Sequence, residues 1–217
     1  MKIGVFDSGV GGLSVANAIS KALPEHEVIL RQDSKHVPYG TRELSEILSF
    51  VTPIFQDLVD NGCEIIVVAC NTVSTNLISR LRDTYNVPLV AVEPMIKPAA
   101  KLTKTQAIAV CATPNTLSSE RYKSLKNEFA KNITLFEPDC SDWSNMIEND
   151  EVDKNKIDEL ISEVLRQKVD VIVLACTHYH WIEDQIKELS KGKAIVLQPE
   201  LAIIEQLKRV IKEVQSN

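Results

Sequence analysis

Short apolar segments alternate along the chain with longer segments in which apolar residues recur at helical spacing. The run Glu64–Cys70 (EIIVVAC) is continuously apolar after its first residue, which is typical of a parallel strand buried on both faces. By the same criteria, strands are predicted at residues 2–8, 26–34, 64–70, 87–94, 106–113, 132–138, 169–176 and 193–199. Helices are predicted at residues 11–23, 42–61, about 71–84, 117–130, 153–167, 181–191 and from about 200 onward. This alternation predicts an α/β fold with mostly parallel sheets.

The strand pattern restarts in the second half of the chain. Residues 64–72 (EIIVVACNT) align with residues 170–178 (DVIVLACTH), an offset of 176 − 70 = 106 residues. Residues 3–8 (IGVFDS) align with residues 108–113 (IAVCAT), an offset of 108 − 3 = 105 residues. Apolar strands can look alike by chance, but the shared Ala-Cys before a small polar residue favours a duplicated βαβ unit.

The duplication predicts how the chain is divided. We expect two similar domains related by a pseudo-twofold axis, with the active site between them. The first comprises residues 1–96 plus about 197–217, and the second comprises residues 97–196.

The composition excludes several classes of protein. The chain has 217 residues, of which 44% are hydrophobic and 25% charged, and its formal net charge is −6. A negative charge argues against a general nucleic-acid or membrane-surface binder, although local donors can still bind an anionic substrate. The first residues, MKIGVFDSGVGG, do not resemble a signal peptide, and no apolar run approaches the roughly 18 residues of a membrane span. We expect a cytoplasmic protein.

The cysteines are unsuited to a disulfide framework. There are five, an odd number, and no pair has C-x-x-C spacing, so neither stapling disulfides nor a zinc site is predicted. We therefore expect free thiols. For any one of them, the ordinary interpretation is a small buried hydrophobic residue.

Two of the cysteines, Cys70 and Cys176, are placed for chemistry. Each ends a predicted strand and precedes a predicted helix. Ligands of open parallel sheets bind beyond the carboxyl ends of the strands, and helix N-termini favour anions and thiolates. Asn71, Thr72 and Thr177 suit helix N-cap positions. If the two units face each other, the two thiols meet across one cleft.

Two opposed thiols around one carbon suit the inversion of a stereocentre. One thiolate removes a proton from one face, and the opposite thiol delivers a proton to the other. A free thiol has a pKa near 8.5, so a neighbouring group must help it ionise at neutral pH. His178 is the predicted helper of Cys176, and Asp7 that of Cys70. The alternatives are a capping or surface histidine and a turn aspartate.

Two loops offer further binding groups. Residues 9–12 (GVGG) lie between a strand and a helix, but they fit neither the phosphate-loop nor the dinucleotide pattern. We expect the backbone N–H groups of this loop, with Ser8, to hold a carboxylate or an amino group. The segment Pro38-Tyr39-Gly40 predicts a second loop, for which ordinary turn chemistry is the alternative.

Together these features resemble the glutamate racemases of the Asp/Glu racemase superfamily. The resemblance spans about residues 1–189, and the paired C-N-T and C-T-H-Y motifs at their spacing make it specific. The matching segments are residues 7–13 (DSGVGGL), 38–40 (PYG), 70–72 (CNT), 112–114 (ATP) with Thr116, and 176–179 (CTHY).

The resemblance implies a cofactor-independent enzyme. Members racemise glutamate and supply the D-enantiomer for the bacterial cell wall, and a homodimer is implied. Cys70 would deprotonate the D-isomer and Cys176 the L-isomer, with Asp7 and His178 assisting. The substrate-binding residues implied by the matching motifs are Ser8, Tyr39, Gly40, Asn71, Thr72, Thr113 and Thr177. Asp33 and Glu148 match two further acidic positions of the family.

The sequence departs from the family's pattern at several positions. Ala175 replaces the usual glycine before the second cysteine, and His180 replaces the usual proline after C-T-H-Y. Residues 139–143 (DCSDW) are more polar than the family's apolar stretch, and the chain is shorter than typical members. These changes bear on substrate size, on Glu148 and on dimer contacts, and they leave both thiols in place.

Other functions stay open from the sequence alone. An aspartate racemase or a racemase of broad specificity is one alternative. Aspartate is shorter than glutamate by one methylene, and a binding pocket discriminates such a difference by only about 1–3 kcal/mol. Decarboxylases and isomerases of the superfamily often keep only one cysteine, whereas this chain keeps both. A degenerate homologue that binds an amino acid or a protein partner has little need for two thiols.

Overall fold

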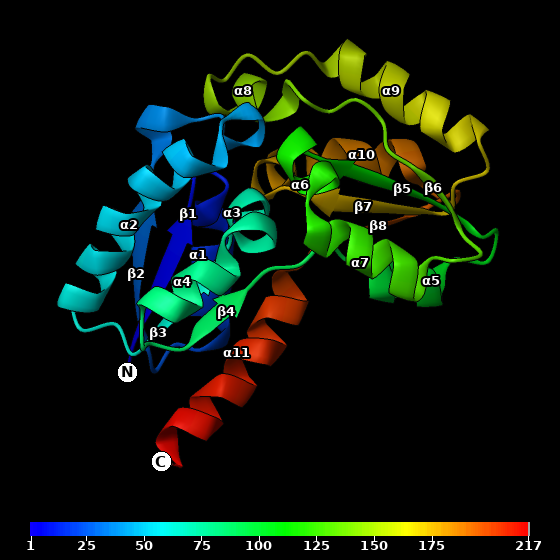
Figure 1. Ribbon diagram of the computed structural model, residues 1–217. Coiled ribbons are helices and arrows are strands. Elements are labelled where there is room, and N and C mark those ends of the chain that lie inside the picture. Colours follow the sequence, from blue (N-terminus) through cyan, green and yellow to red (C-terminus); the bar gives the residue numbers. More distant parts are fainter. Residues whose placement is uncertain (217) are drawn as a thin grey trace.

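The computed structural model describes residues 1–216 and contains two four-stranded sheets, shown in Figure 1. All strand pairs in both sheets are parallel. The first sheet contains β1 (Lys2–Asp7), β2 (Glu27–Gln32), β3 (Ile65–Val68) and β4 (Leu89–Ala91). The second contains β5 (Ala107–Ala112), β6 (Thr134–Phe136), β7 (Val171–Ala175) and β8 (Ile195–Leu197). The predicted α/β class and all the predicted strands are therefore confirmed.

The two sheets repeat one topology. The strand order is β2-β1-β3-β4 in the first and β6-β5-β7-β8 in the second, so each strand corresponds to the one four places later. The register repeats as well: Ile3 lies opposite Ile65, and Ile108 lies opposite Val171. These are the positions that the sequence offsets of 105 and 106 residues relate. The prediction of two similar units is confirmed.

Helices flank both sheets and are listed here with the short 3₁₀ turns. The α-helices are α1 (Gly12–Ala22), α2 (Leu44–Asp60), α3 (Asn71–Asn76), α4 (Ile78–Thr84), α5 (Ile96–Leu102), α6 (Pro114–Ser118), α7 (Glu120–Phe129), α8 (Trp143–Glu148), α9 (Lys154–Arg166), α10 (Glu183–Ser190) and α11 (Glu200–Gln215). The 3₁₀ turns are η1 (Ser34–His36), η2 (Tyr39–Thr41) and η3 (Thr177–Ile182). The predicted helices are confirmed, except that the one after residue 70 divides at Leu77 and the one predicted at residues 117–130 divides at Ser119, between the end of α6 and α7. Neither α5 nor α8 was predicted, nor the start of α6, because segments of five to seven residues are too short to display a helical period.

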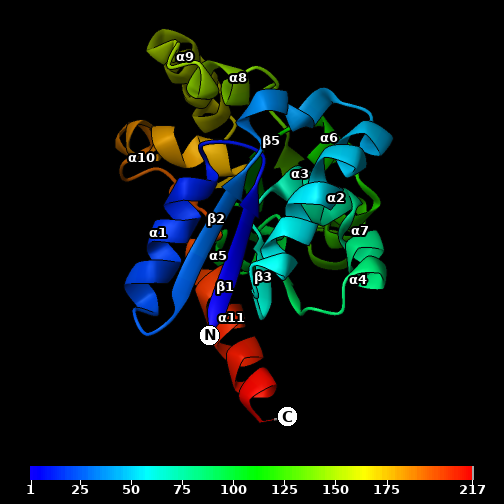
Figure 2. The same ribbon diagram turned by 90° about the vertical axis from the view of Figure 1, so that its left-hand side faces the viewer.

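The central strands of each sheet are buried on both faces. In β3, Ile65 and Val67 point into the core beneath α1 and α11, whereas Ile66 and Val68 point into the core beneath α2. Figure 2 shows α1 and α2 on opposite sides of the β1–β2 part of this sheet. The side-chain alternation of a strand explains why the run is continuously apolar.

The last helix returns to the first unit. Ile203, Leu207 and Ile211 of α11 pack in one core with Val15 and Ile19 of α1, and Figure 1 shows α11 beside β4. We propose domain boundaries at residues 1–96 plus about 197–217, and at 97–196. Residue 217 lies outside the described residues. Within residues 1–216, no helix is long and apolar enough to cross a membrane.

Candidate active site

A small cavity lies where the two units meet. Cys70 follows β3, Cys176 follows β7, and both line this cavity. They are 4% and 7% exposed, respectively. The volume in which the centre of a water molecule can lie is about 10 Å³, so the cavity has room for about one water. Its walls are formed by Ser8, Val37, Pro38, Tyr39, Gly40, Cys70, Asn71, Thr72, Thr113, Ser144, Ala175, Cys176, Thr177 and His178.

The sequence-predicted residues divide into two groups around this cavity. Ten of them are among the lining residues named above. The three acidic residues, Asp7, Asp33 and Glu148, do not line the cavity, and each hydrogen-bonds to a residue that does. These three carboxylates therefore hold residues that line the cavity, without lining it themselves.

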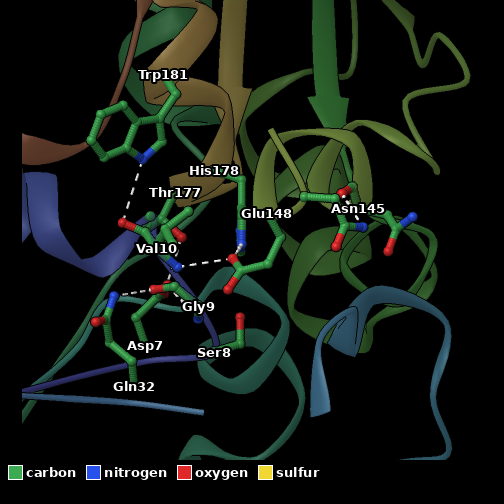
Figure 3. A network of polar contacts seen from close by, with 12 residues as sticks. Asp7, Ser8, Gly9, Val10, Gln32, Asn145, Glu148, Thr177, His178 and Trp181 are labelled. Atoms are coloured by element: carbon green, nitrogen blue, oxygen red, sulfur yellow. Dashed lines mark hydrogen bonds and ion pairs between the residues drawn. The ribbon is translucent and has the colours of Figure 1, made fainter. Parts of the chain in front are cut away.

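On one wall, Cys176 is the first of three groups in a chain. His178 Nδ1 lies 3.8 Å from Cys176 Sγ, and His178 Nε2 lies 2.8 Å from Glu148 Oε2. The same carboxylate oxygen accepts a hydrogen bond of 2.9 Å from the N–H of Val10. Figure 3 shows Glu148 between His178 and Val10. The imidazole is thus held between a thiol and a carboxylate, and His178, 2% exposed, is not the surface histidine of the alternative interpretation.

The charges on this wall favour a protonated imidazole. Burial lowers the pKa of His178, but its hydrogen bonds to Cys176 and Glu148 outweigh burial and raise that pKa to about 10. For Glu148, burial raises the pKa, but the hydrogen bonds from His178 and Val10 produce a net lowering. An imidazolium beside Cys176 is the partner that stabilises a thiolate.

On the other wall, Cys70 is held as a thiol. Its Sγ donates to Ser8 Oγ at 3.4 Å. Burial and the nearby Asp7 carboxylate raise the pKa of Cys70 to about 12, with the Ser8 hydrogen bond opposing the increase. Asp7 therefore disfavours the Cys70 thiolate through its charge. Cys70 is protonated at neutral pH and is ready to donate.

Asp7 connects the two units. Its Oδ1 accepts a hydrogen bond of 3.0 Å from Thr177 Oγ1, and its Oδ2 accepts one of 3.1 Å from the N–H of Gly9. Thr177 lies 170 residues away in the sequence. Asp7 is fully buried, and burial raises its pKa despite the opposing charge of His178. The Gly9 contact is that of a turn residue, but the Thr177 contact joins two distant segments, so Asp7 is more than a turn residue.

The glycine loop approaches the other unit closely. A Cβ atom at Gly9 would lie 2.4 Å from Glu148 Oε2, and one at Gly11 would lie 2.5 Å from the backbone N of His178. Two N–H groups of the loop, those of Gly9 and Val10, hold the protein's own carboxylates, Asp7 and Glu148. These glycines allow the backbone of the first unit to touch that of the second.

The loop containing Tyr39 and Gly40 closes another side of the cavity. The Tyr39 hydroxyl donates to Asp33 Oδ2 at 2.5 Å, and a Cβ atom at Gly40 would lie 2.5 Å from Thr113 Cβ. The side-chain amide of Asn115 donates to the carbonyl of Tyr39 at 2.9 Å. The sequence did not predict Asn115, because nothing in its own segment indicates a contact 76 residues away.

Two predictions of helix capping were wrong. The N-cap residues are the cysteines themselves, Cys70 for α3 and Cys176 for η3, and neither makes a side-chain capping bond. Asn71 is instead the first residue of α3, and both polar atoms of its side chain are buried without a hydrogen-bond partner among residues 1–216. Thr72 Oγ1 lies 3.0 Å from Thr113 Oγ1. The Asn71 amide is therefore free to bind a ligand in the cavity.

The sequence prediction also missed Ser144. This residue of α8 lines the cavity and is 4% exposed. The only signal was the polar character of residues 139–143, which gave no indication of where a hydroxyl would point.

Comparisons with known proteins agree with this fold. The model of the Asp/Glu/hydantoin racemase family matches residues 5–207. A glutamate racemase of Clostridium botulinum (strain Kyoto / Type A2) is 34% identical over 214 residues, covering 97% of this chain and 83% of the relative. A glutamate racemase of Pseudomonas aeruginosa is 36% identical over 214 residues, covering 96% of this chain and 81% of the relative.

A solved structure is similar over nearly the whole chain. The crystal structure of Escherichia coli glutamate racemase in complex with L-glutamate and the activator UDP-MurNAc-Ala superposes with a TM-score of 0.89 at 28% identity. The match covers 97% of this chain and 82% of that one. The family match, the two relatives and the shared architecture lead to one assignment: this chain belongs to the Asp/Glu/hydantoin racemase family.

Proposed function

We propose that this chain interconverts L- and D-glutamate by moving the α-proton between Cys70 and Cys176, without a cofactor. The observation that carries the proposal is that both cysteines line one buried cavity between the two units. The family assignment and the relatives named glutamate racemase support the choice of substrate.

In the direction from L to D, Cys176 acts as the base. Its thiolate, beside the protonated His178, takes the α-proton of L-glutamate and becomes a thiol. Cys70 donates its proton to the opposite face of the α-carbon and becomes a thiolate. The product is D-glutamate. The α-proton of the substrate is now on Cys176, and the proton of Cys70 is now on the α-carbon. With a pKa of about 12, Cys70 carries a proton at neutral pH, as the donor of this direction must.

In the opposite direction the two thiols exchange roles. Cys70 removes the proton from D-glutamate, and Cys176 protonates the other face. His178 is the proposed assisting group of Cys176, and Asp7 is proposed to assist Cys70 in its donor role, by keeping it protonated. The buried amide of Asn71 has hydrogen-bonding capacity to spare for a substrate carboxylate. The other proposed substrate contacts are Ser8, Tyr39, Gly40, Thr72, Thr113 and Thr177.

The cavity is too small for glutamate as it stands. It holds about one water molecule, so the two units must separate for the substrate to enter and leave. With glutamate bound, the walls must lie farther apart than they do here, and they then surround the α-carbon and exclude water, which strengthens the electrostatic interactions of the thiols.

The test is exchange of the α-proton in heavy water, followed by NMR for both enantiomers of glutamate and of aspartate. We expect deuterium at the α-carbon of glutamate, and loss of optical rotation from either enantiomer, with no pyridoxal phosphate added. Tight binding of glutamate without exchange would contradict racemisation and support a binding protein. Faster exchange with aspartate would reassign the substrate.

Substitution of single cysteines tests the two-base scheme. Cys70→Ser and Cys176→Ser are each expected to lower the racemisation rate by about 10²–10⁴-fold, the contribution typical of a positioned acid or base. Cys63→Ser is the matched control, because Cys63 is also buried but does not line the cavity. Full activity in either of the first two variants contradicts the scheme.

The cellular role and assembly are further parts of the proposal. We propose that the chain supplies D-glutamate for peptidoglycan synthesis in the cytoplasm and acts as a homodimer. Growth of a D-glutamate-requiring bacterium after expression of the chain, compared with its Cys70→Ser variant, tests the role. Sedimentation equilibrium tests the dimer, and a monomeric mass at micromolar concentration contradicts it.

A further inference from the structure

Ser144 presents an unused hydroxyl to the cavity. Its Oγ atom is buried and has no hydrogen-bond partner among residues 1–216. Of the side chains that line the cavity, only those of Ser144 and Asn71 have such unpartnered atoms in the described part of the chain. Buried polar groups are nearly always hydrogen-bonded, and an exception in a cavity indicates a missing ligand.

The other hydroxyls of the cavity are already engaged. The hydroxyl of Ser8 accepts from Cys70 at 3.4 Å, and that of Thr177 donates to Asp7 at 3.0 Å. The hydroxyls of Thr72 and Thr113 lie 3.0 Å apart. Ser144 therefore differs from every other hydroxyl on the wall in having its full hydrogen-bonding capacity free.

The surrounding residues hold Ser144 in place. Its neighbour Trp143 is fully buried and packs edge-on against Tyr179, with ring centroids 5.2 Å apart. One turn later on α8, Glu148 is anchored by His178 and by the N–H of Val10. Both ends of this short helix are thus fixed against the wall that carries Cys176, so the hydroxyl does not need to be ordered when a ligand binds.

We propose that Ser144 donates a hydrogen bond to the side-chain carboxylate of the bound substrate and so helps to select an acidic amino acid. This inference rests on the proposed function. The groups attached to the α-carbon must lie near both sulphurs, and therefore near the residues that directly follow β3 and β7. Ser144 comes from α8, outside those strand ends, and so faces the part of the cavity left for the substrate's side chain.

The test compares Ser144→Ala with the wild-type protein. We expect KM for glutamate to rise roughly 10- to 100-fold, as for a lost hydrogen bond to a charged group, with kcat within about twofold. The inhibition constant of L-norvaline, which lacks the side-chain carboxylate, should stay unchanged. Ser144→Thr keeps a hydroxyl and should restore much of the affinity for glutamate.

A stability measurement separates ligand binding from a structural role. Removing an unpartnered buried hydroxyl should raise Tm, by about 2 °C or more, whereas loss of a structural contact would lower it. Ser190→Ala is the matched control, because Ser190 is fully buried with an unpartnered hydroxyl in the described chain but lies outside the cavity. We expect it to raise Tm and leave KM unchanged.

Each outcome has one meaning. If the wild type exchanges the α-proton of glutamate and Ser144→Ala retains the wild-type KM, the assignment of Ser144 is overturned and the proposed function stands. Equal weakening of glutamate and norvaline overturns the assignment to the side-chain carboxylate. If the wild type neither binds nor exchanges glutamate, the proposed function fails and the assignment of Ser144 fails with it.

Discussion

His178 Nε2 lies 2.8 Å from Oε2 of Glu148, a residue 30 positions earlier in the chain. The contact fixes the ring so that Nδ1, its other nitrogen, is directed at Cys176 Sγ 3.8 Å away. A histidine whose second nitrogen is held by a carboxylate has a defined orientation and an increased preference for the charged form. Glu148 is in turn held by the N–H of Val10, so the glycine loop of the first unit helps to position a residue of the second.

Glu148→Gln tests whether this carboxylate acts through His178. The substitution keeps the shape but removes the charge, so the pKa of His178 should fall from about 10. We expect kcat/KM to drop roughly 10- to 100-fold, the value of a hydrogen bond between charged groups. The high-pH limb of the kcat/KM profile should also move to lower pH.

The control for this prediction is Glu151→Gln. Glu151 is exposed and lies three residues beyond Glu148, so its substitution changes the net charge equally without touching His178. An unchanged pH profile in Glu148→Gln, at any level of activity, contradicts the positioning role.

The dependence of stability on pH should report the charge of His178. Its pKa is about 10 in the folded protein, raised from 6.5, so the folded state binds the proton more tightly than the unfolded state does. The stabilisation is therefore fully present below about pH 6.5 and is lost as pH rises through about 10. The Tm difference between the wild type and His178→Gln should accordingly be largest at pH 6.5 and shrink toward pH 10.

Taking this difference cancels groups that titrate in both proteins, including Cys70. A Tm difference that increases as pH rises would indicate a neutral imidazole and would contradict an ion pair between His178 and Glu148.

Asp7→Asn should make Cys70 easier to ionise. The Asp7 carboxylate is, after burial, the main reason that the pKa of Cys70 reaches about 12, so its removal should lower that pKa. The difference in thiolate absorbance between Asp7→Asn and the Asp7→Asn, Cys70→Ser double variant isolates the thiol. The midpoint of the Cys70 titration, followed by this absorbance, should fall in Asp7→Asn. The control Asp60→Asn, at an exposed position on α2, should leave that midpoint at its wild-type pH. A midpoint that does not fall in Asp7→Asn contradicts the electrostatic link.

Much of the fold could be predicted because its signals are local. Continuous apolar runs marked the strands, and the repeated Ala-Cys at the ends of two of them marked the duplication. The same strand ends located Cys70 and Cys176, because parallel strands bring their carboxyl ends to one edge of a sheet.

The supporting contacts could not be predicted in this way. Thr177 reaches Asp7 over 170 residues, and Asn115 reaches Tyr39 over 76, distances at which no periodicity connects the partners. Ser144 was missed because α8 has only six residues, too few for its buried face to be recognised from spacing. Asn71 and Thr177 looked like caps because their residue types favour that position, but the backbone places the preceding cysteine there.

Gly11→Ala should prevent the two units from closing. The φ of Gly11 is −59°, which alanine adopts without strain, so any effect must come from the added Cβ atom. That atom would lie 2.5 Å from the backbone N of His178 and 2.5 Å from the carbonyl carbon of Thr177, and neither can move without shifting η3. A displacement of about 1 Å between catalytic groups can lower a rate about 100-fold, and we expect a loss of kcat/KM of that size with an unchanged far-UV circular dichroism spectrum. The control is Asn17→Ala, at an exposed position of α1, the helix that Gly11 precedes, and it should retain wild-type kcat/KM. Equal activity in the two variants would mean that close contact between α1 and η3 is not needed for turnover.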